Sequence, residues 1–591
     1  MKKEKKIFLF TGMPLGIAKG VNVCMFFLSV LCSLISILQV YVVSDFINAA
    51  MLSVEKRGIS SSLIITIILL MATVALDWIM PRINGLLRKK AELALLKEYR
   101  PKLLKKCAAL SYTYMEQADS QNLISRVLEQ TERKWQDIYQ AMLALLKLLI
   151  SIAGILFIIA SYVWWAAVLI FLFCLPLFYF SVRGGKVNYQ ARRDTSQYIR
   201  KYSYLDSVLN NREYVDERSL FGYTGQVNEQ YAEAYREAFG IETKTQIYWA
   251  IKTKLSGGLS AIAALLIVIT LIQPTLSGKI PIGLFVSLVN AVFLLTNQMS
   301  WGLSRNIDAL VGGNEFCRDI HKFLSLPEEE GALDLPDYME AIKTIEFRHV
   351  SFSYPGTDFC VLKDVSFVMN WGKNYALVGA NGAGKTTVIK LLTGLYESYE
   401  GEILINGKEL RHYKKSEQKG MFSVVYQDYI QHALTVRENC EIGDPCSSVP
   451  EEKMRDLIDS FDLKKTIEAL PMGYDTLLGK IREGGMDISG GQWQKLAMIR
   501  ALLRPAKVRI LDEPTASLDP KMESEIYSLF RKMAEETLTI LISHRLGFAR
   551  LADEILVFEN GSVCEQGAFP ELMEKRGLFC HMYEEQRSWY E

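Results

Sequence analysis

The run Gly379–Thr387 has the composition of a loop that could hold a phosphate group, because it reads Gly-Ala-Asn-Gly-Ala-Gly-Lys-Thr-Thr. The apolar run Tyr375–Val378 precedes it and the apolar run Val388–Leu392 follows it, which predicts a strand, a loop and a helix. Glycines let backbone N–H groups curl around an anion at the start of a helix. Lys385 could neutralise phosphate charge, and the Thr386 hydroxyl could hold Mg²⁺. The spacing therefore predicts a nucleotide-binding P-loop.

Two neighbouring carboxylates stand further along the chain, at the end of a mostly apolar run. Val508–Leu511 contains one charged residue, Arg509, which is unusual in such a strand, and Asp512 and Glu513 follow it. In phosphoryl transfer, one such carboxylate can hold the metal ion and a second can polarise the attacking water. We therefore expect Asp512 to contact Mg²⁺ and Glu513 to activate water.

The segment Ile488–Gln492 indicates the kind of nucleotide site. It reads Ile-Ser-Gly-Gly-Gln and stands shortly before Asp512. In this respect the chain resembles the ATP-binding cassette (ABC) family, whose signature loop is usually Leu-Ser-Gly-Gly-Gln. The resemblance implies four further functional residues, which are a Q-loop glutamine at Gln427, a D-loop acid at Asp519, a switch histidine at His544 and an adenine-stacking ring at Tyr354.

Taken together, these motifs predict a site for ATP and Mg²⁺, the two expected cofactors. The residues expected to bind ATP are Tyr354, Gly379, Asn381, Gly382, Ala383, Gly384, Lys385, Thr386, Thr387 and Gln427. The residues expected to hold Mg²⁺ are Thr386, Gln427 and Asp512. The residues expected to act in catalysis are Glu513, His544 and Lys385.

The signature loop is expected to bind the ATP of a partner chain. A glycine-rich loop before a helix can form a second anion site, because its N–H groups can point at the γ-phosphate. By the resemblance, each ATP lies between the P-loop of one cassette and the signature of the other in a head-to-tail dimer. The residues expected to contact the partner's ATP are Ser489, Gly490, Gly491 and Gln492. Because the chain carries one P-loop and one signature, it needs a companion.

By the same resemblance, the companion is expected to be a second half-transporter, a chain with one membrane domain and one cassette. Heteromeric exporters often contain one impaired chain that has lost the catalytic glutamate or the switch histidine. This chain keeps both Glu513 and His544. A homodimer is slightly favoured, and a heterodimer in which this chain is the competent member stays open.

A membrane portion is predicted from composition. Half of the 591 residues are apolar, which is a high share for a soluble protein of this length. The net charge of +1 gives no general electrostatic reason to bind nucleic acid, so no nucleic-acid partner is expected. The ten cysteines are scattered without the spacing of a metal site.

Uncharged runs long enough to cross a bilayer occupy the first half of the chain. They cover 20–44, 58–76, 148–182, 255–278 and 280–304, and about 20 residues of helix suffice for one crossing. The third run is long enough for a hairpin, and its middle, Ser161–Trp165, carries aromatic residues that prefer the membrane interface. The chain should therefore turn there, which makes six spans. Membrane lipids are the expected surroundings of these spans.

The orientation of the spans follows from the basic residues. They cluster in Lys2–Lys6, Arg82–Lys134 and Arg183–Lys201, and the positive-inside rule puts these segments in the cytoplasm. Both termini are then cytoplasmic, and the long inner loops should be helical extensions. The lysine-rich start is not expected to be a cleaved signal peptide, because the apolar run after it is too long. The expected location is the plasma or inner membrane.

The predicted fold class is an α-helical six-span transmembrane domain plus an α/β P-loop nucleotide-binding domain with an antiparallel β subdomain. The transmembrane domain covers 1–325, an acidic linker broken by proline and glycine covers 326–340, and the nucleotide-binding domain covers 341–591. Alternating segments at Ile345–Phe347 and Val350–Tyr354 predict the antiparallel strands.

Six spans followed by one cassette resemble the exporter-type half-transporters, which include lipid A flippases and bacterial multidrug and peptide exporters. The resemblance implies ATP-driven transport, with export expected, and coupling helices near Leu110–Gln117 and Asn210–Val215. No charge falls near the bilayer centre, which favours an amphipathic or apolar cargo such as a drug, lipid or peptide. No leader-cleaving peptidase domain is expected before the first span.

Two alternative functions stay open at this point. Some proteins of this architecture import siderophores, and the sequence does not fix the direction of transport. An ATP-gated channel or regulatory subunit is the second alternative. It is disfavoured because the chain has no long extra region for regulation.

Overall fold

The computed structural model describes residues 14–297, 302–446, 449–480, 484–514, 537–543 and 546–588. The chain folds as two compact units. The first, here called the membrane unit, comprises Met1–Cys107 and Asn122–Leu326. The second, the nucleotide unit, comprises Ala108–Gln121 and Pro327–Glu591.

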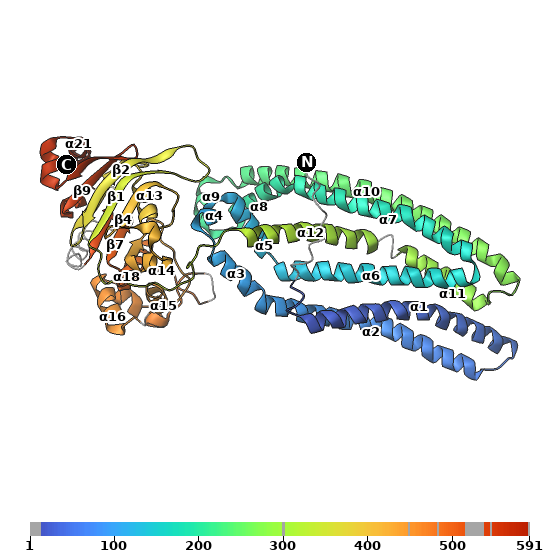
Figure 1. Ribbon diagram of the computed structural model, residues 1–591. Coiled ribbons are helices and arrows are strands. Elements are labelled where there is room, and N and C mark those ends of the chain that lie inside the picture. Colours follow the sequence, from blue (N-terminus) through green and yellow to red (C-terminus); the bar gives the residue numbers. More distant parts are fainter. Residues whose placement is uncertain are drawn as a thin grey trace. The chain divides into compact units, whose positions relative to one another are not determined.

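Long helices that lie side by side make up the membrane unit (Figure 1). Its helices in chain order are α1 (Lys19–Glu55), α2 (Ser61–Glu98), α3 (Arg100–Ala108), α5 (Ala118–Leu128), α6 (Thr131–Tyr162), α7 (Trp164–Asp194), α8 (Ser196–Asn210), α9 (Val215–Phe221), α10 (Thr224–Leu276), α11 (Ile282–Asn297) and α12 (Ser304–Ser325). The longest, α10, has 53 residues. At 1.5 Å per residue it is about 80 Å long, far more than the roughly 30 Å of a hydrocarbon core.

The turn predicted at Ser161–Trp165 is confirmed, because α6 ends at Tyr162 and α7 begins at Trp164. Among the described residues, three helical stretches are long and apolar enough to cross a membrane, and they are Lys19–Glu55, Ser61–Ala108 and Thr131–Tyr162. The other predicted spans fall on α7, α10 and α11. Six spans are therefore compatible with the structure.

A close approach between α1 and α11 depends on a glycine. The Gly283 amide donates to Oδ1 of Asn48 at 2.9 Å. A Cβ added at Gly283 would lie 2.1 Å from the backbone oxygen of Ser44, closer than real Cβ contacts. The start of α11 can approach α1 this closely only without a side chain.

Gly283→Ala is therefore expected to destabilise the protein, since overpacking a tight contact costs about 1–3 kcal/mol. Thermal unfolding of the purified full chain measures the effect. Gly85→Ala is the matched control, because Gly85 also lies within a helix of the membrane unit and an added Cβ there meets nothing within 4 Å. Equal melting temperatures for the two variants would contradict the prediction.

Two sheets form the frame of the nucleotide unit. The antiparallel sheet has the order β2-β1-β4-β5 and contains β1 (Thr344–Ser353), β2 (Cys360–Asn370), β4 (Glu400–Ile405) and β5 (Lys408–Glu409). The second sheet has the order β10-β9-β3-β8-β7-β6 and contains β3 (Asn374–Gly379), β6 (Phe422–Val425), β7 (Val508–Asp512), β8 (Leu538–Ile542), β9 (Glu554–Glu559) and β10 (Ser562–Gly567). Strands β6, β7, β8, β3 and β9 are parallel to their neighbours, and β10 is antiparallel to β9. The predicted α/β domain with an antiparallel subdomain is confirmed.

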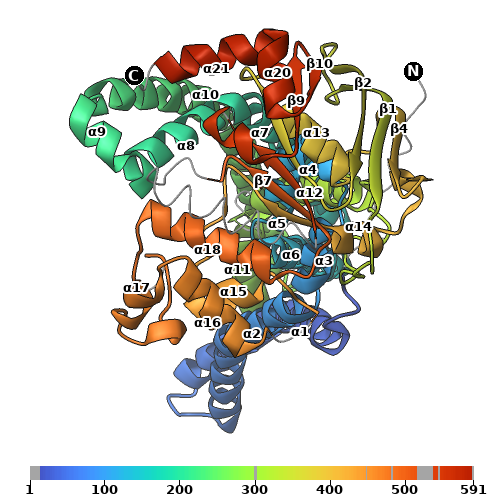
Figure 2. The ribbon, with the colours of Figure 1, turned by 90° about the vertical axis from the view of Figure 1, so that its left-hand side faces the viewer.

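Helices cover both faces of the six-stranded sheet. They are α13 (Lys385–Leu392), α14 (Lys415–Met421), α15 (Val436–Glu441), α16 (Glu451–Ser460), α17 (Lys464–Glu468), α18 (Gly490–Leu503), α20 (Phe569–Lys575) and α21 (Leu578–Ser588). One core joins α13, the antiparallel sheet and one face of the six strands. On the other face, α15–α18 form a second core over β6–β8, and α20 and α21 form a third over β3 and β9 (Figure 2). Because strand side chains alternate, β8 serves two cores, with Ile540 in the first and Leu541 in the second.

A short helix from an early loop also belongs to the nucleotide unit. Helix α4 (Tyr112–Glu116) lies within the predicted stretch Leu110–Gln117. The Tyr112 ring meets Tyr396 edge-on at 5.4 Å, and Glu116 pairs with Lys390 of α13 at 3.1 Å. At the second predicted stretch, Asn210–Val215, a short 3-10 helix, Arg212–Tyr214, leads into α9. A coupling role for either stretch remains a prediction.

The residues of the predicted linker pack on this unit. Nζ of Lys419 donates to the backbone oxygens of Gly331, Ala332 and Asp334. Nζ of Lys415 pairs with Glu329 at 2.5 Å. These lysines come from α14, so the segment after Pro327 is held by charge and backbone hydrogen bonds.

Candidate active site

The P-loop has the backbone shape that its glycines allow. It leaves β3 at Gly379, whose φ is +147° and where an added Cβ would lie 2.2 Å from the backbone oxygen of Phe558. Gly382 and Gly384 also have positive φ, at +80° and +101°. Gly384 is the N-cap of α13, so the first N–H groups of that helix face the loop. The sequence Gly-x-x-Gly-x-Gly thus positions a helix N-terminus for an anion.

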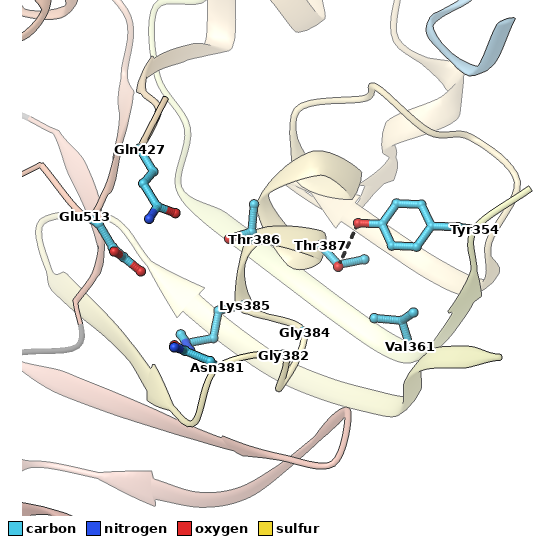
Figure 3. Close-up of a pocket in the computed structure, with 10 residues that line it drawn as sticks. All are labelled: Tyr354, Val361, Asn381, Gly382, Gly384, Lys385, Thr386, Thr387, Gln427 and Glu513. Atoms are coloured by element: carbon cyan, nitrogen blue, oxygen red, sulfur yellow. Dashed lines mark hydrogen bonds between the residues drawn. The ribbon is translucent and has the colours of Figure 1, made fainter. Parts of the chain in front are cut away.

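A pocket of about 510 Å³ opens at this loop (Figure 3). Its lining residues are Tyr354, Val361, Asn381, Gly382, Gly384, Lys385, Thr386, Thr387, Gln427 and Glu513. Gln427 and Glu513 lie at one end of the pocket, Tyr354 and Val361 lie at the other, and the P-loop lies between them. Nine residues predicted from the sequence therefore gather here. The tenth, Val361 of β2, was missed.

Two predicted P-loop residues lie just outside the lining. Ala383 is 5% exposed and packs in the first core. Gly379 contributes its backbone oxygen, which accepts a hydrogen bond from Nζ of Lys385 at 2.8 Å. Both residues therefore stabilise the P-loop without lining the pocket.

Lys385 is buried beside the loop it comes from. Its side chain is 5% exposed, and Nζ donates to the oxygens of Gly379 and Ala380 at 2.8 and 2.9 Å. Burial lowers the pKa of Lys385, whereas Glu513 and Asp512 act to raise it. A phosphate entering the pocket would meet an ammonium group already held in place.

Asp512 at the end of β7 contacts the P-loop helix. Its Oδ2 accepts from the Thr386 hydroxyl at 3.2 Å. It is 2% exposed, and burial raises its pKa to about 6. Its Oδ1 has no hydrogen-bond partner among the described residues. This arrangement leaves a buried carboxylate oxygen available to a cation.

The donor set suits Mg²⁺ held jointly with a nucleotide. The described residues contain no group of three or more His, Cys, Asp or Glu side chains placed to hold a metal. Mg²⁺ commonly uses one or two protein oxygens and takes the rest from phosphates and water. Asp512, Thr386 and Gln427 could supply those oxygens. Bound there, the ion would neutralise charge on the phosphates.

Glu513 follows Asp512 in a backbone conformation that is rare for its type. Its φ is +49°, in the left-handed region. Its amide is held by the backbone oxygen of Ile542 at 3.0 Å. The resulting sharp bend ends β7 and aims the carboxylate into the pocket (Figure 3). Backbone conformations of this kind persist where the surroundings enforce them, and they gather at functional sites.

Tyr354 forms the far wall of the pocket. Its hydroxyl lies 3.0 Å from that of Thr387, and its ring packs edge-on against Phe352 and Tyr396. Val361 lies next to it in Figure 3 and adds an apolar surface. The ring is therefore held in a fixed position beside the P-loop, suited to stacking on a planar base.

Tyr354→Ala is expected to raise the Kd for ATP about tenfold, since stacking of a base on an aromatic ring contributes about 1–3 kcal/mol. Tyr354→Phe keeps the ring, so its Kd for ATP should stay close to that of the unchanged chain. Titration with a fluorescent ATP analogue compares the three proteins. If alanine and phenylalanine weakened binding equally, the ring would not be the binding surface.

The signature residues form a separate structure at the start of α18. Ser489 is its N-cap, and its hydroxyl accepts from the Gln492 amide at 3.3 Å. Oε1 of Gln492 in turn accepts from the Ser489 amide at 2.8 Å. Gly490 and Gly491 occupy the first turn, and none of these residues lines the pocket described above. The predicted D-loop acid, Asp519, and the switch histidine, His544, lie outside the described residues.

Comparison with known proteins covers most of the chain. Residues 23–299 match the family model of the ABC transporter transmembrane region, and residues 362–516 match that of the ABC transporter. The lipid A-core flippase of Paraburkholderia xenovorans is 30% identical over 434 residues, which cover 71% of this chain and 70% of the flippase. The subtilin transport ATP-binding protein of Bacillus subtilis is 28% identical over 94% of this chain and 90% of its own length.

A second relative and a solved structure extend the comparison. The nisin transport ATP-binding protein of Lactococcus lactis is 27% identical over 94% of this chain and 92% of its own length. The structure of a bacterial Atm1-family ABC exporter with ATP bound superposes with a TM-score of 0.75 at 21% identity, covering 97% of this chain and 98% of that one. The chain has the fold of that exporter. With its P-loop, paired carboxylates and signature in place, this chain belongs to the ABC transporter family.

Proposed function

We propose that this chain exports an amphipathic peptide across the membrane, driven by ATP hydrolysis, as a dimer of half-transporters. The observation that carries the proposal is the separation of two phosphate-binding elements in one chain. The P-loop, Gln427 and Glu513 share a pocket, whereas the signature residues at the start of α18 do not line it. A second cassette that brought its own signature to this pocket would complete the site.

The proposed chemistry assigns one task to each polar group. Lys385 would bind the β- and γ-phosphates, and Asp512, Thr386 and Gln427 would hold the Mg²⁺ that accompanies ATP. Glu513 accepts a proton from the attacking water, which its position at the pocket end permits. His544 is proposed to stabilise the transferring phosphate. Closure of two cassettes around ATP and release after hydrolysis would then drive the membrane helices.

A peptide is proposed as the cargo because two relatives that match 94% of this chain are named for subtilin and nisin transport. The lipid A-core flippase relative makes a lipid the alternative amphipathic cargo, although that match covers 71% of the chain. Both termini are proposed to face the cytoplasm. A homodimer is proposed because Glu513 and His544 are both retained.

The purified chain reconstituted alone into liposomes tests self-sufficiency and cargo together. Amphipathic peptides should stimulate ATP hydrolysis more than lipids, drugs or siderophores at equal concentration. The absence of hydrolysis by the unchanged chain would contradict the homodimer. Stimulation by siderophores alone would contradict the proposed cargo.

Inside-out vesicles test the direction of transport. A labelled peptide should accumulate in vesicles supplied with ATP and not in vesicles that carry Glu513→Gln. Loss of preloaded cargo from the same vesicles would indicate import. Passive conductance that does not need hydrolysis would indicate a channel.

A further inference from the structure

Tyr429 links the Q-loop segment to the signature helix within one chain. Its hydroxyl donates to the backbone oxygen of Gly490 at 2.8 Å. The Tyr429 ring is partly buried against the core that contains α15–α18. Gly490 is the first residue of α18. A helical carbonyl can accept a second hydrogen bond because it has two lone pairs.

This hydrogen bond lies at the N-terminal end of α18, where the first N–H groups of the helix could bind a phosphate. The first N–H groups of a helix have no partner inside the helix. The Ser489 hydroxyl already accepts the Gln492 amide, so the amides of Gly490 and Gly491 are the ones a phosphate could approach. By fixing the Gly490 carbonyl, Tyr429 fixes the peptide plane that carries the Gly491 amide.

A second contact holds the same segment further along α18. Arg500 donates from Nη1 to the Ile430 oxygen at 3.4 Å, from Nε to the Asn439 oxygen at 3.1 Å, and from Nη2 to Asn439 Oδ1 at 2.9 Å. Asn439 is fully buried, and its Nδ2 donates to the oxygens of His432 and Leu434 at 3.1 and 3.2 Å. The segment after Gln427 is thus attached to α18 near the start of the helix and again near its end.

The chain between the pocket and this attachment is short. Gln427 lines the pocket, and Tyr429 follows two residues later. Two residues of backbone reach at most about 7 Å. A displacement of Gln427 when it meets Mg²⁺ and the γ-phosphate would therefore act directly on the Tyr429 hydroxyl.

We infer that Tyr429 is a positioning residue that ties the signature loop to the occupancy of the chain's own ATP site. ATP at one pocket then orients, through Gln427 and Tyr429, the amides that this chain presents to its partner's ATP. This inference rests on the proposed dimer function. It adds Tyr429 as the residue whose hydroxyl holds the first residue of α18 in the connection between the two ATP sites of the dimer.

Tyr429→Phe removes that hydroxyl alone, and amide hydrogen exchange of the purified full chain measures the effect. Without nucleotide, exchange in the peptide spanning residues 486–494 should rise about 3- to 10-fold, the effect of losing one hydrogen bond. Tyr413→Phe is the matched control, because the Tyr413 hydroxyl donates to the Ile405 oxygen at the same 2.8 Å, in the antiparallel sheet. Tyr413→Phe should leave hydrogen exchange in residues 486–494 unchanged.

A second arm adds Mg·ATP to chains that also carry Glu513→Gln. The ATP concentration that protects residues 486–494 should rise about 3- to 10-fold in Tyr429→Phe, again the effect of one hydrogen bond. Binding of a fluorescent ATP analogue at the chain's own pocket should not change. If Tyr429 only stabilised the fold, the ATP concentration needed for protection would not change separately from the ATP affinity of the pocket.

Three outcomes would overturn the inference. The first is equal hydrogen exchange in Tyr429→Phe and the unchanged chain. The second is a rise in exchange that extends to the β1 peptide, as general unfolding would cause. The third is weaker ATP binding at the pocket that accounts for the whole shift in the ATP concentration needed for protection. Failure of the unchanged chain to bind ATP would contradict the proposed function instead. In that case the nucleotide-free arm still decides whether Tyr429 holds the signature loop.

Discussion

Glu513→Gln is expected to lower the rate of ATP hydrolysis at least about 100-fold, since general bases contribute about 10²- to 10⁴-fold. The amide keeps the size of the side chain but cannot accept the proton of the attacking water. Binding of Mg·ATP should be retained, because Lys385 and Asp512 are unchanged. Phosphate release by the reconstituted chain and titration with a fluorescent ATP analogue measure the two quantities separately.

The matched control for this substitution is Glu441→Gln. Glu441 is exposed at the end of α15, and surface substitutions of this kind usually change the free energy of unfolding by no more than about 0.5 kcal/mol. If the rate of ATP hydrolysis by Glu513→Gln were within tenfold of the rate of the control, another group would activate the water. Loss of ATP binding in Glu513→Gln would show that the left-handed bend at this residue depends on the carboxylate.

Lys385→Met should weaken ATP binding at least about 100-fold, because each hydrogen bond to a charged group contributes about 1.5–3 kcal/mol. Nζ of Lys385 donates hydrogen bonds to the oxygens of Gly379 and Ala380. Methionine fills a similar volume and removes a buried charge, so the nucleotide-free protein should melt at nearly the same temperature. The stabilisation that ATP confers should be lost, since it depends on affinity.

Lys373→Met is the matched control for the lysine. Lys373 lies just before β3, the strand that leads into the P-loop, and its side chain is 47% exposed where it pairs with Glu554. This variant should keep the full rise in melting temperature on addition of Mg·ATP. An unchanged rise in Lys385→Met would mean that Lys385 does not contact the nucleotide.

The parts that could be predicted from the sequence are those set by local pattern. The P-loop, β7 with its two carboxylates and the turn near Val163 each follow from neighbouring residues, because glycine spacing, strand alternation and interfacial aromatics act over a few positions. The five runs of apolar residues likewise mark helices. The last of them, 280–304, includes α11, which covers Ile282–Asn297.

The parts that were missed depend on contacts between distant segments. Val361 reaches the pocket because β2 pairs with β1, which places the start of β2 beside the P-loop. Tyr429 meets Gly490 across 61 positions. The sequence predicts an acidic linker at 326–340 but not its contacts with Lys415 and Lys419 of α14. No local pattern encodes such pairings.

The single residue between α6 and α7 limits how the transporter can move. Only Val163 separates the two helices, so their adjoining ends cannot part by more than a few ångström, whatever the rest of the bundle does. Any opening of the membrane unit must therefore separate other pairs of helices, or separate the far ends of α6 and α7 while their adjoining ends stay together.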